Sequence, residues 1–457
     1  MLPLANDDKS YGTINDSSAT EVNKQYVVYS QRWAVLMAFS LLSCINNWIW
    51  ITWSPLAKEI ASFWSVPTSS VDNLSAVFMY VYIPLSFPAL HLLHKYKLRW
   101  GLLVGGSLNF VGSLVRFMGA CSYIWVYVGT LLCAISQTLT LAMPPLISAL
   151  WFQERERGLA TSIGVLANHL GSAFGLGITI LVDFSPKVGD DDAANERENI
   201  DTATLVSYLR LQMLLSGFSL ILIALFVRSS SPPTPPSEAA FAQKQTSFME
   251  SISLFLGKQA GIMLCVVYGL AVGVLYAVAT FLSQMFLDLD QGESEGNYTR
   301  FWSEKETGYL GLVHILASVF GPLVSGEYLD RTQEYRGTSI ALLSSSIASM
   351  LGLFIYLEAL SSLRWLPYAA ISFAGFFLTG FISVGFEYGT AIAYPADEAV
   401  VAGVMNVAAQ IGGWMLVGLG DIAVSSIGGM LVAALAIAFS LMVSIRAKSA
   451  RPVTRSS

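Results

Sequence analysis

Residues 228–247 read RSSSPPTPPSEAAFAQKQTS, a stretch rich in proline and serine between two long apolar regions. Such composition is typical of a linker, because proline and small polar residues do not build a packed element. The chain has 457 residues, of which 54% are hydrophobic and only 12% charged. Soluble domains carry about twice that charged fraction, so the sequence predicts a membrane protein.

Apolar runs long enough to cross a bilayer as helices lie on both sides of this linker. A helix of about 20 residues crosses the hydrocarbon layer, and the sequence contains twelve candidate runs, six before the linker and six after it. The runs are 33–57, 72–94, 101–120, 124–149, 157–182, 205–228, 259–287, 306–328, 338–357, 365–393, 399–424 and 426–446.

The distribution of positive charge predicts the orientation. With the N-terminus inside, 17 of the 25 Lys and Arg fall in inner segments and six in outer loops. The remaining two, Arg116 and Arg210, lie near outer helix ends and are expected to snorkel to the interface. Cytoplasmic loops favour Lys and Arg, so both termini are predicted to be cytoplasmic. The polar N-terminal tail has no apolar segment of its own, and no cleaved signal peptide is expected.

The linker divides the chain into two halves that resemble each other. ERGLATSIGVLANHLG opens the fifth run and AVVAGVMNVAAQIGG opens the eleventh, with His169 and Gln410 at matching points. Paired six-helix halves around a central site are typical of the major facilitator fold. The predicted fold is therefore an all-α membrane protein with twelve transmembrane helices. Its expected parts are a cytoplasmic N-terminal tail (1–31), an N-terminal half (32–228), a cytoplasmic linker (229–256), a C-terminal half (257–446) and a cytoplasmic C-terminal tail (447–457).

Polar side chains near the middle of the runs indicate a central site, because a polar group in hydrocarbon needs a partner or a cavity. The candidates are Trp50, Tyr276, Gln410, His169, Asn46, Gln137, Asn168 and Asn406. Asn46, Trp50 and Trp53 are spaced to share one helix face. For each amide the alternative is a hydrogen bond between helices, and for each aromatic residue it is packing. His169 could be a core histidine, a proton carrier or a ligand contact.

This set of residues favours a cation with apolar bulk. Aromatic faces attract quaternary ammonium groups by about 2 kcal/mol when desolvated, and no Lys or Arg lies in the middle of a run to bind a carboxylate. Neither a metal site nor a disulfide framework is indicated, because the four cysteines are scattered. No cofactor is expected. An enzyme is the least favoured class, because no nucleophile–base pair or phosphate loop is present.

Charged residues at the inner helix ends suggest a gate. The loop SGEYLDRTQEYRG contains Asp330 and Arg331, which predict a charge latch that stabilises an outward-open state. This loop and LLHKYKLRW, which follows the second run, resemble the recurrent inner-loop motif of the major facilitator fold. In LLHKYKLRW, the position where that motif usually has Asp is His94. Glu387 lies in the cytoplasmic half of the tenth run and is predicted to act in an inner gate or ion pair. Asn297, in the sequon NYT of an outer loop, is the predicted glycosylation site.

The sequence resembles the feline leukaemia virus subgroup C receptor (FLVCR) family. The stretches that carry the resemblance include NNWIWITWS, VLANHLGSAFG, GVLYAVATFLSQM and AGVMNVAAQIGG. It implies transport of choline and ethanolamine, with haem export as an older assignment. It also implies a pocket of Trp50, Tyr276 and Gln410, with His169 where the family has glutamine.

The resulting hypothesis is a monomeric, facilitative transporter of a small organic cation that works by alternating access. The alternatives are an exporter of haem or another porphyrin, a transporter of another small metabolite, and a receptor without transport activity. The expected partners are the lipid bilayer and the small-molecule substrate, and no nucleic acid. The plasma membrane is the expected location, with a vacuolar or lysosomal membrane as the alternative.

Overall fold

The computed structural model is helical, with no strand in the part of the chain that it describes. The described residues are 29–53, 56–181, 201–235, 246–287, 302, 304–358, 363–422 and 427–447. Before the linker the helices are α1 Gln31–Ile51, α2 Ala57–Trp64, α3 Thr68–Met118, α4 Tyr123–Thr140, α5 Met143–Trp151, α6 Arg157–Leu181 and α7 Thr202–Phe226. After it they are α9 Phe248–Leu256, α10 Gln259–Leu287, α11 Glu304–Thr332, α12 Tyr335–Glu358, α13 Trp365–Ala393, α14 Glu398–Ile422 and α15 Ile427–Ser444.

The helices match the predicted membrane spans. Within the described residues, ten helices are long and apolar enough to cross a membrane. One of them, α3, contains two predicted spans, because its backbone leaves the helical region at Lys97 (φ 69°, ψ 177°). The 25-residue α6 corresponds to a further predicted span but is not among the ten. Each predicted apolar run therefore overlaps at least one helix of the described residues.

Two predicted runs are not single helices, and for one of them the sequence explains the break. The run 124–149 is α4 followed by α5, which starts with Pro144 and Pro145 in its first turn. Proline has no N–H for an intrahelical hydrogen bond, so it fits well in the first turn of a helix, where no such bond is made. The run 33–57 contains α1 and then the separate short helix α2, which begins at Ala57.

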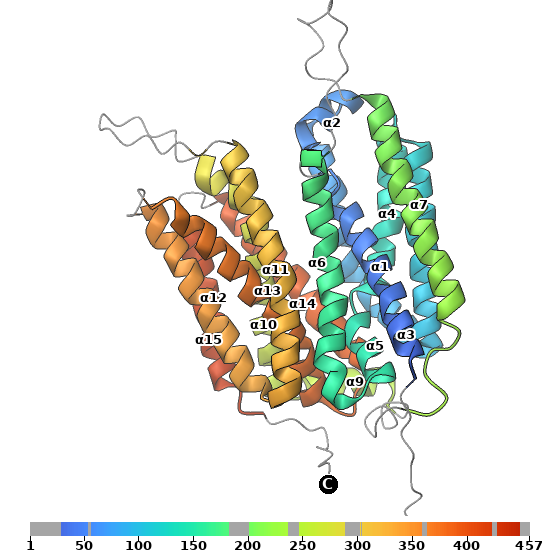
Figure 1. Ribbon diagram of the computed structural model, residues 1–457. Coiled ribbons are helices and arrows are strands. Elements are labelled where there is room, and N and C mark those ends of the chain that lie inside the picture. The colour runs from blue at the N-terminus through green and yellow to red at the C-terminus, as the bar shows by residue number, and fades with distance from the viewer. Residues whose placement is uncertain are drawn as a thin grey trace, which may run out of the picture.

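The helices form two groups that lie side by side, α1–α7 and α10–α15 (Figure 1). We call the end of the bundle where α7 ends and α9 begins the linker end. The two groups approach each other there and diverge toward the opposite end (Figure 1). Between the groups, α6 contacts α11 and α13, and α14 contacts α3 and α5. The second group packs around one large apolar core, whereas the first has three smaller ones.

Arg116 does not snorkel as expected but is buried inside the first group, with 1% of its surface exposed. Its guanidinium carbon lies 5.1 Å from the ring centroid of Trp53, just beyond the end of α1. Cation–π attraction to a desolvated tryptophan is worth about 2 kcal/mol. This contact partly offsets the cost of burying the charge and ties α3 to the end of α1.

Glycine lets α3 and α4 cross closely. A Cβ atom on Gly129 would lie 2.5 Å from the carbonyl oxygen of Gly112, and one on Gly112 would lie 2.5 Å from the carbonyl oxygen of Gly129. No side chain fits at this crossing without moving a backbone.

We expect Gly129→Ala to lower the free energy of unfolding by about 1–3 kcal/mol, the usual cost of overpacking. The measurement is the thermal melting temperature of the purified protein in detergent. Gly418→Ala is the matched control, because a Cβ atom there meets nothing within 4 Å. Equal melting temperatures for the two variants would contradict the close crossing.

Candidate functional site

A cavity of about 130 Å³ lies between the two groups of helices. Seven of the eight residues predicted for the site line it, namely Trp50, Gln137, Asn168, His169, Tyr276, Asn406 and Gln410. The first four come from α1, α4 and α6, and the other three from α10 and α14. Both halves therefore build the cavity, and the mid-depth polar residues converge on it.

Asn46 was expected beside Trp50 in the site, and the structure places it elsewhere. Its side-chain amide donates hydrogen bonds to Asn109 Oδ1 and to the carbonyl oxygen of Cys133, both at 2.9 Å. It is fully buried and is not a lining residue. The cavity face of α1 instead passes through Ser43, Asn47 and Trp50, which are spaced i, i+4, i+7.

Two aromatic rings from opposite halves meet at the cavity. The ring centroids of Trp50 and Tyr276 are 6.2 Å apart, with the planes inclined at 55°. Ser75 on α3 holds Trp50 from both sides: the indole N–H donates to the Ser75 carbonyl at 3.1 Å, and the Ser75 hydroxyl donates to the Trp50 carbonyl at 3.0 Å. These paired bonds fix the orientation of the indole, leaving a preorganised aromatic surface for a guest.

The amide side chains divide into bonded and unbonded groups. The Asn406 amide donates to the carbonyl oxygen of Leu141 at 3.1 Å, which joins α14 to the end of α4. The Asn168 amide lies 3.3 Å from the hydroxyl of Ser43. By contrast, Gln137 Oε1 and Gln410 Oε1 are buried and make no hydrogen bond to the described residues, although the Gln410 side chain lies next to Tyr276. A bound molecule with hydrogen-bond donors would satisfy these two oxygens.

Two histidines line the cavity, and sequence reasoning found only one. His169 on α6 has no hydrogen bond to a described residue. His314 on α11 is the one that was missed; its Nδ1 lies 3.0 Å from the carbonyl oxygen of Ile371. An ionisable residue inside an apolar run was the available signal, since such residues mark functional sites.

The cavity lining carries no formal charge apart from what its two histidines could acquire. The described lining residues include no Asp, Glu, Lys or Arg. The described part of the chain also has no group of three or more His, Cys, Asp or Glu placed to hold a metal ion. Binding at this site therefore depends on aromatic faces and on uncharged hydrogen-bonding groups.

Acidic side chains join the halves at the linker end. Asp330, at the end of α11, accepts hydrogen bonds from the backbone N–H groups of Gly158 and Leu159 at 2.8 and 2.7 Å. These amides belong to the first turn of α6, where the helix dipole favours a negative charge. Glu387 on α13 is buried and accepts from the Thr161 hydroxyl of α6 at 2.7 Å. Both carboxylates therefore cross from the second half to the first.

Arg331 takes no part in this arrangement, contrary to the predicted latch. Its side chain is 76% exposed and pairs with Glu327 on its own helix at 2.8 Å. The two neighbours point differently because successive residues of a helix are rotated by about 100°. The contact that Asp330 makes with the other half is between a carboxylate and a helix N-terminus.

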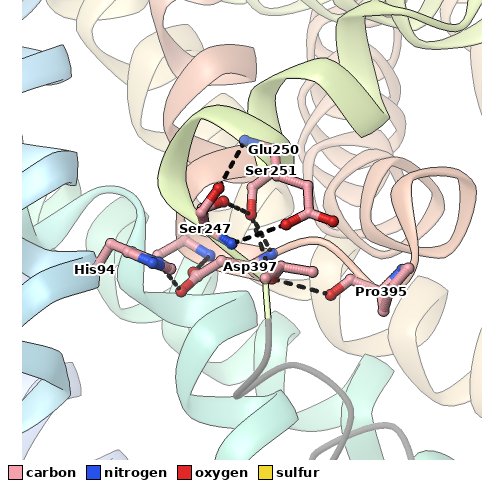
Figure 2. A network of polar contacts seen from close by, with 8 residues as sticks. His94, Ser247, Glu250, Ser251, Pro395 and Asp397 are labelled. Carbon is pink, nitrogen blue, oxygen red and sulfur yellow. Dashed lines mark hydrogen bonds and ion pairs between the residues drawn. The ribbon is translucent and has the colours of Figure 1, made fainter.

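A second group of cross-half contacts surrounds Asp397, just before α14 (Figure 2). Its Oδ2 lies 2.8 Å from Nδ1 of His94 on α3. Its backbone N–H donates to the Ser251 hydroxyl of α9 at 3.1 Å, and its Oδ1 caps α14 at Ala399 N. Next to it, Glu398 lies 3.7 Å from Arg157. His94, which stands at the motif's usual Asp position, thus contacts an Asp of the other half.

The predicted glycosylation site, Asn297, lies outside the described residues.

The amino-acid sequence and the fold both match known proteins. The sequence matches the Major Facilitator Superfamily over residues 33–417, and the chain belongs to that superfamily. Among solved structures, "a Major Facilitator Superfamily (MFS) transporter, FucP, in the outward conformation" is similar with a TM-score of 0.66 and 13% identity. The match covers 91% of this chain and 100% of that one. The protein is a multi-pass membrane transporter.

Closer relatives identify the family. A Danio rerio protein named Choline/ethanolamine transporter flvcr2b is 33% identical over 395 residues, covering 84% of this chain and 76% of that protein. The Homo sapiens Choline/ethanolamine transporter FLVCR2 is 30% identical over 408 residues, covering 87% and 73%. The chain belongs to the FLVCR family, as its sequence stretches indicated.

We expect Asp330→Asn to weaken the closed linker end, because hydrogen bonds to a charged group contribute about 1.5–3 kcal/mol each. The measurement uses a protein whose native cysteines are replaced by serine and which carries Thr140→Cys in the cavity lining. Labelling of this cysteine by a membrane-impermeant reagent applied from the linker end should become at least about tenfold faster.

Arg331→Ala is the matched control, because it changes the neighbouring residue and removes only an exposed pair. Its labelling rate should stay within about twofold of the parent protein, as exposed ion pairs contribute about 0–1 kcal/mol. Equal acceleration by both variants would show that Asp330 has no special role.

Proposed function

We propose that the protein binds a small organic cation of the choline or ethanolamine type in the central cavity and moves it by alternating access. The observation that carries the proposal is the uncharged lining of the cavity, with Trp50 and Tyr276 in contact across the halves. Aromatic faces attract a desolvated ammonium group by about 2 kcal/mol. The names of the relatives, choline/ethanolamine transporters, support the same substrate class.

The size of the cavity favours this class over porphyrins. Its volume of about 130 Å³ is below the roughly 300–1,000 Å³ of pockets for drug-sized ligands. His169 lines the cavity and has no hydrogen bond to a described residue, so a ring nitrogen is available to bind the iron of a haem. A planar macrocycle nevertheless needs more room than this conformation provides.

The proposed moving units are the helices of residues 32–228 and 257–446. With the linker end on the cytoplasmic side, as the charge distribution predicts, the conformation is open to the outside and closed to the cytoplasm. Asp330, Glu387 and Asp397 form the proposed inner gate, because each contacts the opposite half. Alternating access then requires these contacts to break while new ones form at the opposite end.

The membrane potential is the proposed driving force. A monovalent cation that moves inward gains about 2.3 kcal/mol per 100 mV. No acidic residue among the described lining residues is placed to bind a coupling ion together with the substrate. Facilitated uptake across the plasma membrane fits this arrangement best.

We expect Trp50→Ala to reduce the uptake of labelled choline and ethanolamine by cells at least about 30-fold, which corresponds to losing a 2 kcal/mol cation–π contact. Surface abundance, measured by biotinylation, should stay normal. Trp414→Ala is the matched control, because Trp414 is 61% exposed on the outer face of α14 and is not a lining residue. Normal uptake by Trp50→Ala at normal abundance would refute the proposed site.

A further inference from the structure

The central cavity presents more hydrogen-bond acceptors than the protein itself satisfies. Gln137 on α4 and Gln410 on α14 are only 5% and 4% exposed, and the Oε1 atom of each has no partner among the residues that the structure describes. Both residues line the cavity and come from opposite halves. A buried acceptor without a partner is costly, so it indicates what a bound molecule must bring.

His314 adds a third acceptor. A carbonyl oxygen can only accept a hydrogen bond, so the Nδ1 atom that lies 3.0 Å from the Ile371 carbonyl must carry the proton. In the neutral ring this leaves Nε2 with a lone pair. The structure gives Nε2 no hydrogen bond to a described residue, and His314 lines the cavity. The contact with Ile371 therefore fixes the tautomer that accepts.

We infer that the site prefers a primary ammonium group to a quaternary one, with Gln137, Gln410 and His314 accepting its N–H bonds. This inference rests on the proposed function, because it concerns the same cavity. A primary ammonium has three N–H donors, which equals the number of these acceptors. A trimethylammonium group has none and would leave all three unpaired.

The aromatic rings do not oppose this preference. Trp50 and Tyr276 attract either kind of cation, since their interaction depends on charge and not on N–H groups. The preference for a primary over a quaternary ammonium group therefore comes from the acceptors on Gln137, Gln410 and His314. A site that hydrogen-bonds a donor group rejects an analogue without it more strongly than an apolar pocket rejects an extra methyl group. His169, the other imidazole of the lining, remains available to a ligand hydroxyl as donor or acceptor.

The test is a series of four ligands that differ only in N-methylation: ethanolamine, N-methylethanolamine, N,N-dimethylethanolamine and choline. Dissociation constants are measured on the purified full-length protein by isothermal titration calorimetry. We expect affinity to fall stepwise along the series, with ethanolamine binding at least about tenfold more tightly than choline. Equal affinities, or tightest binding of choline, would overturn the inference and leave the proposed function standing. If none of the four ligands binds, the proposed function itself fails.

Substitutions of His314 and Gln137 test whether these acceptors produce the preference for a primary ammonium group. His314→Phe removes the acceptor but keeps a flat ring, and it should reduce the ratio of the ethanolamine and choline affinities about tenfold. Gln137→Leu should have the same effect from the other half. His91→Phe is the matched control, because His91 packs against Phe248 near the linker end, away from the cavity lining. A ratio unchanged in both His314→Phe and Gln137→Leu would contradict the assignment.

Discussion

Inside the hydrocarbon layer no water is available, so every polar group must bond within the protein or face a cavity. This constraint sorts the polar residues of α1. Asn46 bonds to Asn109, Asn47 bonds to the Asn168 carbonyl, and the Trp50 indole bonds to Ser75. Through these bonds α1 is joined to α3 and α6 of the first half. Two of the buried acceptors that have no partner among the described residues, Gln137 Oε1 and Gln410 Oε1, are at the cavity. The need to satisfy polar groups within the membrane therefore bears both on helix packing and on the chemistry of the cavity.

The same constraint explains why the linker end can hold the halves together without locking them. Asp330 and Glu387 each place a carboxylate among hydrogen-bond donors of the first half. Such a group is costly to bury alone and is stable only while its partners surround it. In the proposed alternating-access cycle the halves separate at this end, and water then enters and solvates the freed groups. The hydration offsets part of the lost bonding, so the two arrangements can lie close in free energy.

The sequence predicted the fold well, because hydropathy and the linker depend on composition alone. It also found seven polar or aromatic residues of the cavity lining, because depth in a helix can be counted. The sequence could not show how each helix is rotated about its axis, or which residue of another helix each polar side chain contacts. Asn46 and Trp50 lie on nearly the same face of α1, yet Asn46 is taken by Asn109, a residue 63 positions away. Asp330 and Arg331 are adjacent, yet only Asp330 reaches α6. These outcomes depend on neighbours that pattern reasoning cannot place.

The position of the site between the halves has a consequence for transport. Trp50 belongs to α1 and Tyr276 to α10, so the aromatic contact exists only while the two halves hold these helices near each other. A ligand that touches both rings binds more tightly to conformations that keep them close, and it shifts the population toward those conformations. Any guest that contacts one half only has no such differential affinity and cannot drive the change. Selectivity for transport is therefore stricter than selectivity for binding, because it requires simultaneous contact with both halves.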